Sequence, residues 1–239
     1  MSYRTYLKSL SILSILISSM VISISAHSEQ DIISKHQYKL YKGTILFGKS
    51  TYSLYKHDNI YFFEIKSQTD GVFKLKKDYR LERSEFKKND HLISPIQYEY
   101  IRQKKDKDDY IITKFDNDLI ATTLVNKEKK EHMNINGALD RLSLQIAFQE
   151  SMKKGVFEKT YNVIDKGRLR EYTFTIHSDD VIETLFGKTN TIVIKRKIKN
   201  NKRSTLTWYA IDHNYIPVKI EQYRKKSLKF TVILENIIK

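Results

Sequence analysis

The chain has 239 residues, of which 40% are hydrophobic, 30% charged and 12% aromatic, and this balance excludes a disordered protein. It contains no cysteine, which excludes disulfide bonds, thiol chemistry and attachment as a bacterial lipoprotein, so the core must provide stability alone. Lysine and arginine outnumber aspartate and glutamate by 43 to 28, a surplus that favours anionic partners.

The N-terminal segment is expected to be a secretory signal peptide. Arg4 and Lys8 precede the uncharged run LSILSILISSMVISI, and small residues follow at Ser25 and Ala26. We therefore expect export to the periplasm, with a signal peptide over residues 1–26. The alternative is an uncleaved anchor, but the serines within the run lower its apolarity, so no stable transmembrane segment is expected after cleavage.

The surplus of cations belongs to the mature chain, residues 27–239. An exported protein seldom meets nucleic acid, so we expect no nucleic acid partner and favour an anionic surface of the cell envelope. The alternative is that the lysines, which lie in small groups along the chain, are solvated residues of strands and turns.

From Tyr38 onward, apolar and polar residues mostly alternate, which predicts β-strands. The stretch 38–69 has the pattern of three strands, and Asp58-Asn59 is typical of the turn between the second and the third. The dipeptide Asp70-Gly71 then predicts a tight hairpin into the next strand.

One segment breaks the alternation and predicts the principal α-helix, over about residues 138–153. Its apolar residues recur at helical spacing in NINGALDRLSLQIAFQESMKKG. Asn136 is expected to cap the helix, Asp140 to lie in its first turn, and Gly155 to end it. The apolar face is wide, so we expect the helix to be buried against a sheet.

Alternation returns after the helix and predicts about six further strands. The turns that separate them are expected at Asp165–Gly167, Ser178–Asp180, Gly187-Lys188, Lys199–Lys202, Asp212–Asn214 and Lys225–Ser227. No linker divides residues 27–239, which we therefore expect to form a single β-rich domain. We predict a mainly β fold, a large curled antiparallel sheet (a half-barrel or open barrel) around the principal helix, because a long sheet curls or closes to remove its edges.

No pattern of residues indicates catalytic chemistry. There is no Gly-x-Ser-x-Gly motif, and the seven histidines are far apart in the sequence. The pairs Asp108/Asp109 and Asp179/Asp180 have the chemistry of turns, and Asp212-His213 has that of a hairpin tip. We therefore predict no catalytic residues, no metal site and no cofactor.

Four segments, in order, carry a resemblance to a known family. They are YKLYKGTILFGKSTYSL, SPIQYEY, ALDRLSLQIAF and the C-terminal pattern VIETLFGKTNTIVIKR…RSTLTWYAIDHNYIPVKIEQ, which together span about residues 38–222. This set resembles a bacterial exported family, domain of unknown function 3108; one departure is Leu185, where the family pattern has proline. The resemblance implies an exported, β-rich protein without an established activity.

The hairpin that contains Trp208 and Pro217 is also similar to one in the periplasmic lipoprotein-carrier proteins. The resemblance implies the architecture of those proteins, in which a half-barrel with a helix as its lid shelters acyl chains. It covers little of the chain, and architecture alone does not fix function.

The favoured hypothesis is a non-enzymatic binding or carrier protein for an apolar or lipid-like ligand of the envelope, held between sheet and helix. The candidate lining residues, each of which taken singly is more simply explained as core, are Leu142, Ile146, Phe148, Trp208 and Ile220. An alternative is an envelope structural or assembly protein that acts through protein contacts, by strand addition at an exposed edge. A hydrolase whose site is assembled from distant residues is the third hypothesis.

Overall fold

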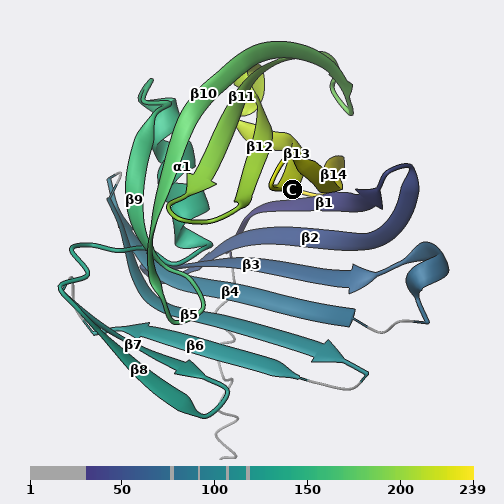
Figure 1. The fold of residues 1–239 in the computed structure, drawn as a ribbon. Coiled ribbons are helices and arrows are strands. Elements are labelled where there is room, and N and C mark those ends of the chain that lie inside the picture. The colour runs from purple at the N-terminus through teal and green to yellow at the C-terminus, as the bar shows by residue number, and fades with distance from the viewer. Residues whose placement is uncertain (1–30, 76–77, 91, 106–107, 117–118) are drawn as a thin grey trace, which may run out of the picture.

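The computed structural model describes residues 31–75, 78–90, 92–105, 108–116 and 119–239. The expected signal peptide, residues 1–26, lies outside these residues. Within them, one open sheet of 14 antiparallel strands curls around one α-helix, so the predicted fold class is confirmed (Figure 1).

The strands form two meanders that meet in the middle of the sheet. The first comprises β1 (Asp31–Lys42), β2 (Ile45–His57), β3 (Ile60–Thr69), β4 (Asp78–Asn89), β5 (Leu92–Lys104), β6 (Asp109–Phe115), β7 (Ile120–Val125) and β8 (Glu128–Met133). The second comprises β9 (Lys159–Ile164), β10 (Leu169–Thr184), β11 (Gly187–Ile198), β12 (Arg203–Ala210), β13 (Ile216–Arg224) and β14 (Ser227–Ile237). Strand β1 pairs with β14, and the meanders run outward from this pair to edge strands β8 and β9.

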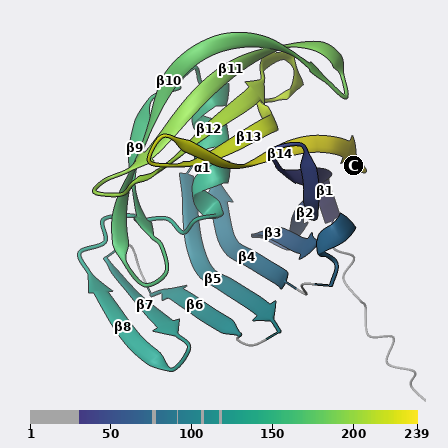
Figure 2. The same ribbon diagram turned by 45° about the vertical axis from the view of Figure 1, so that its right-hand side comes forward.

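The segment between the two meanders crosses the concave face of the sheet. Because β8 and β9 lie at opposite edges, the chain must return from one edge to the other, and it does so through α1 (Ser143–Lys153). Figures 1 and 2 show the sheet curving around this helix. The connection therefore places the helix where the inward side chains of the strands need an apolar partner.

The helix begins five residues later than its spacing predicts. Asn136, the expected cap, has a left-handed backbone with φ of 46°, and Leu139 pairs with Val163 of β9 in a parallel bridge. Asp140 caps the helix instead, because its Oδ1 accepts hydrogen bonds from the backbone N–H groups of Leu142 (2.7 Å) and Ser143 (2.9 Å). The backbone of Leu139 is thus paired with β9, and the helix begins only after it.

Three of the expected turns are wrong. Gly187-Lys188 begins strand β11, and the turn before it is formed by Leu185 and Phe186. Ser178–Asp180 lies inside the 16-residue strand β10, just after a β-bulge between Ile176 and Ser178, and the three residues are polar because they are exposed on the strand. Asp70-Gly71 leads into a short 3-10 helix, η1 (Gly71–Phe73), rather than a tight hairpin. The six strands after the helix are confirmed, as is the hairpin tip at Asp212, which lies in the 3-10 helix η2 (Ile211–His213).

The main core lies between α1 and the concave face. Phe148 and Leu144 of the helix are fully buried, together with Phe86 of β4 and Phe174 of β10. The rings of Phe148 and Phe174 stack with their centroids 4.0 Å apart. Burial of each large apolar side chain contributes roughly 1.5–3 kcal/mol, so this packing stabilises the helix and the strands that contact it.

Candidate functional site

The inward side chains change from apolar to charged along several strands. On β11, Ile192 and Ile194 belong to the core around α1, and the next residue on the same face is Arg196. On β10, Phe174 and Tyr172 belong to this core, and the next residue on the same face towards the start of the strand is Arg170. One end of the concave face is therefore packed with apolar residues, and the other end is cationic.

The charged end encloses a cavity of about 830 Å³. Its walls come from β4 and β5 in the first meander, from β10 to β14 in the second, and from the residues on either side of α1 and β9. Among the described residues that line it, two are acidic, Glu82 and Asp165. The cationic lining residues are Arg80, Arg141, Lys166, Arg168, Arg170, Arg196, Arg203, Arg224 and Lys229.

The two carboxylates of the cavity are shared between two arginines. Arg141 lies between them, with Nη1 3.6 Å from Oε2 of Glu82 and Nε 3.7 Å from Oδ1 of Asp165. Arg170 Nε lies 3.5 Å from the other oxygen of Asp165, which also accepts a hydrogen bond from the hydroxyl of Tyr172. The charge of Glu82 raises the pKa of Arg141 well above its ordinary value. These carboxylates thus hold Arg141 and Arg170 in place.

Arg196 has no such partner. Its Nη2 donates a hydrogen bond to Oγ1 of Thr205 (2.9 Å), and its guanidinium carbon lies 5.3 Å from the ring centroid of Tyr172. Its Nε is buried and has no hydrogen-bond partner, and no carboxylate of the described residues forms an ion pair with it. Burial lowers the pKa of Arg196 below its ordinary value, because the charged form is the one that loses hydration.

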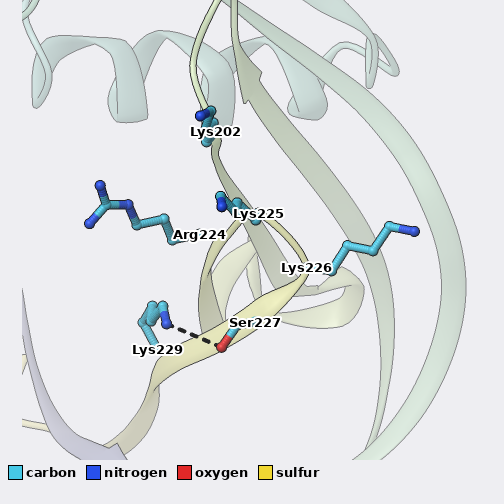
Figure 3. Close-up of a pocket in the computed structure, with 6 residues that line it drawn as sticks. All are labelled: Lys202, Arg224, Lys225, Lys226, Ser227 and Lys229. Atoms are coloured by element: carbon cyan, nitrogen blue, oxygen red, sulfur yellow. Dashed lines mark hydrogen bonds between the residues drawn. The ribbon is translucent and has the colours of Figure 1, made fainter.

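A second cationic cluster lies at the edge of this cavity. The turns β11–β12 and β13–β14 bring together Lys202, Arg224, Lys225, Lys226, Ser227 and Lys229 around a hollow of about 730 Å³ (Figure 3). Arg224 and Lys229 line both the hollow and the cavity. In Figure 3, Lys226 points away from Arg224, and Lys229 donates a hydrogen bond to Ser227 (3.1 Å). The cationic lining therefore continues onto the surface.

The five residues predicted to line a ligand site lie elsewhere. Leu142, Ile146 and Phe148 are buried in the core between α1 and the sheet. Trp208 and Ile220 belong to a second apolar cluster, formed with residues of β1, β11 and β14. The structure thus brings the first three together and places the other two apart, and none of the five contacts the cationic cavity. Their role in binding stays a prediction.

Trp208 belongs to the other face of the sheet. It pairs directly with Val193, which alternates with the helix-facing residues of β11, so its ring lies on the side away from α1. Its Nε1 donates a hydrogen bond to Oδ2 of Asp180 (2.9 Å), and the Nζ of Lys219 lies 4.1 Å from its ring centroid. These contacts explain why Asp180, which the sequence suggests is a turn residue, lies within a strand.

Two further observations bear on the chemistry of the described part of the chain. No three of its histidine, aspartate and glutamate side chains gather as ligands of a metal ion would. None of its helices is long and apolar enough to span a membrane. The absence of a catalytic, metal or cofactor site stays a prediction.

The sequence profile of the family described as "Protein of unknown function (DUF3108)" matches residues 37–232. The chain belongs to this family. The match covers β2 to β13, the helix and parts of β1 and β14, and therefore every residue that lines the cationic cavity. No curated protein matches the sequence of this DUF3108 protein.

Two solved structures are similar to this DUF3108 protein to different degrees. A β-barrel-like protein of domain of unknown function DUF1849 from Brucella abortus is similar with a TM-score of 0.57 and 8% sequence identity, over 85% of this chain and 96% of that one. A putative exported protein with YmcC-like fold from Bacteroides fragilis gives a TM-score of 0.35 and 12% identity, over 86% and 95% of the two chains. The first likeness shows a shared fold and nothing of function.

Proposed function

We propose that this protein is an exported, non-enzymatic binding or carrier protein that holds its ligand in the cavity of the concave face. The observation that carries the proposal is the cavity of about 830 Å³, which lies between strands of both meanders. Small-molecule sites commonly measure about 300–1,000 Å³ and are lined by a mixture of apolar and convergent polar groups. The N-terminal pattern of residues 1–26 supports the assignment to the periplasm.

The lining of the cavity favours an amphiphilic ligand over a wholly apolar one. Hydrocarbon placed against charged guanidinium groups would remove their water without replacing its hydrogen bonds, which is costly. Ile198 and Phe230 also line the cavity and offer apolar contact beside the charges. A lipid-like ligand with an anionic group satisfies both kinds of wall, and the cluster around Lys226 suits an anionic envelope surface.

The edges of the sheet give less support to an assembly protein that works by strand addition. The edge strand β8 carries exposed charges, including Lys129 and Lys130, and such charges oppose pairing with another chain. The edge strand β9 already forms backbone hydrogen bonds with Leu139, which donates to Asn162 (2.9 Å) and accepts from Ile164 (2.8 Å). The binding proposal therefore accounts for more of the structure.

The proposal is tested with protein purified from its native envelope. Mass spectrometry of organic and aqueous extracts should find one ligand class in stoichiometric amount. The variant Gln222→Trp, which places a large ring in the cavity, should lose that ligand, whereas Lys129→Trp on the exposed edge strand should retain it. Empty extracts from the native protein, or equal retention by both variants, would contradict the proposal.

A further inference from the structure

Arg196 has hydrogen-bonding capacity that the protein itself does not satisfy. A guanidinium group carries five N–H donors in a planar fork. One of them reaches Thr205, while the buried Nε–H has no partner. Arg170 Nε is also buried without a hydrogen bond, although it lies 3.5 Å from Asp165. Buried donors are almost always paired in folded proteins, so two of them in one cavity indicate a missing acceptor.

The charges around Arg196 point to the same missing group. Lys166, which lies in the same cavity, has its Nζ 4.9 Å from the ring centroid of Tyr100. Burial, and after it the charge of Arg141, lower the pKa of Lys166. The lining contains nine cations and two carboxylates, so the cavity carries a surplus of positive charge. A ligand with more than one negative charge would offset it.

We infer that the cavity binds a phosphate-type oxyanion, with Arg196 as its principal binding residue and Arg170 and Lys166 beside it. This inference rests on the proposed function and names the charged group of the ligand. The planar fork of an arginine matches pairs of phosphate oxygens and donates two parallel hydrogen bonds to them. Thr205 accepts a hydrogen bond from Arg196, which leaves its own O–H to donate to the same oxyanion.

The oxyanion has two possible sources that share this chemistry. It is either the headgroup of a phospholipid, whose chains would lie along Ile198 and Phe230, or a phosphorylated solute. Inorganic pyrophosphate serves as the soluble probe, and dihexanoyl phosphatidic acid below its micelle concentration serves as the lipid probe. Dihexanoyl phosphatidylcholine, which has similar chains but no net charge, measures the contribution of the chains alone.

Calorimetric titration of the exported protein compares two variants that each lose one positive charge. Arg196→Gln should weaken binding of the phosphate probes about tenfold or more, because a charge-assisted bidentate contact is lost. Lys226→Gln in the surface cluster should change it less than about twofold, because exposed charges act weakly. Circular dichroism and the melting temperature establish that both variants are folded.

The outcomes separate this inference from the proposed function. Tighter binding of phosphatidic acid than of pyrophosphate assigns the site to a lipid headgroup, and the reverse assigns it to a solute. The inference is overturned if neither probe binds at millimolar concentration, or if Arg196→Gln and Lys226→Gln weaken binding equally. A stoichiometric neutral ligand in the native extracts would also overturn it while leaving the binding function intact.

Discussion

The two ends of the concave face share the same strands but differ in chemistry. On β11, Ile194 packs against the helix and Arg196, two residues further on, lines the cavity. The 11-residue helix is about 16 Å long. The 16-residue strand β10 extends about 53 Å. The helix therefore covers only part of the concavity. The cavity lies beyond the start of the helix, near the N-terminal end of β10, and its lining contains nine cations and two carboxylates.

This difference separates stability from binding. Residues beneath the helix make the close contacts that a folded core requires. A cavity cation without a carboxylate partner, such as Arg196, contributes little to folding, because a buried charge without a counter-charge is unfavourable. Truncation of a packed residue should therefore lower stability strongly, whereas replacement of an unpaired cation of the cavity should raise it, and the predictions below test that contrast.

The largest effect is expected from Phe148→Ala at the packed end. Phe148 is fully buried and stacks on Phe174, so truncation should lower the free energy of unfolding by about 3–5 kcal/mol. Phe230→Ala at the cavity should cost much less, because Phe230 is only partly buried. Urea denaturation of both variants measures the contrast, and equal losses would contradict the division of the concave face.

A smaller loss is expected from Asp140→Ala, where the helix joins the sheet. Besides capping the helix, the buried carboxylate accepts hydrogen bonds from the hydroxyls of Ser84 (2.6 Å) and Ser143 (2.7 Å). Its removal leaves several buried donors unpaired, so we expect a loss of about 2–3 kcal/mol. Ser84→Ala removes one of these bonds and should cost about 1 kcal/mol by the same denaturation measurement. If Asp140→Ala lowers the free energy of unfolding by no more than Ser84→Ala does, Asp140 does not link the helix to the sheet as described.

The alternation of residues was sufficient to predict the sheet, and its interruption was sufficient to predict the helix. The start of the helix depends on a contact that spacing does not reveal, because Asp140 binds Ser84, which lies on a distant strand. The bulge in β10 was equally hidden, because Ser178–Asp180 has the composition of a turn. Its place within a strand involves Asp180, which binds Trp208 on another strand.

The cavity was missed although one signal for it was present. Arg196 continues the alternation of Ile192 and Ile194, which places it on the inward face, but it also lies within a basic run that suggests a solvated strand. Local sequence does not show that α1 begins only after Arg141 and leaves this position uncovered, nor that Asp165 is already shared by Arg141 and Arg170. Those facts arise from packing between distant segments.

At the cavity, Arg196→Met should raise stability in the absence of ligand. Methionine fills much of the same volume without a buried, unpaired charge, so we expect a gain of about 1–2 kcal/mol in the free energy of unfolding. Arg141→Met should instead lower stability, because Glu82 and Asp165 would lose their shared partner. Denaturation of the ligand-depleted protein measures both, and a loss of stability in Arg196→Met would show that Arg196 serves folding.

The smallest effect is expected from a change in pH. It concerns Glu150, a carboxylate at the packed end that forms ion pairs with two lysines. Glu150 of the helix lies 2.8 Å from the Nζ of Lys153 and 3.0 Å from that of Lys88 on β4. Burial raises the pKa of Glu150, but its hydrogen bonds to these lysines lower it more, from an ordinary value of 4.5 to about 2. Because the folded-state pKa is the lower one, the ion pairs stabilise the protein above pH 4.5, and this contribution is lost as pH falls towards 2.

Glu150→Gln isolates this contribution, because the other carboxylates titrate alike in both proteins. The variant should be less stable than the native protein at pH 6 by up to about 1 kcal/mol, since the lysines are partly exposed to water. The difference between the two melting curves should shrink as the pH is lowered from 5 to 2, where Glu150 becomes protonated. A constant difference across this range would mean that Glu150 acts through packing alone. A shrinking difference would show that the ion pairs of Glu150 stabilise the packed end, in contrast to Arg196 of the cavity, which has no carboxylate partner.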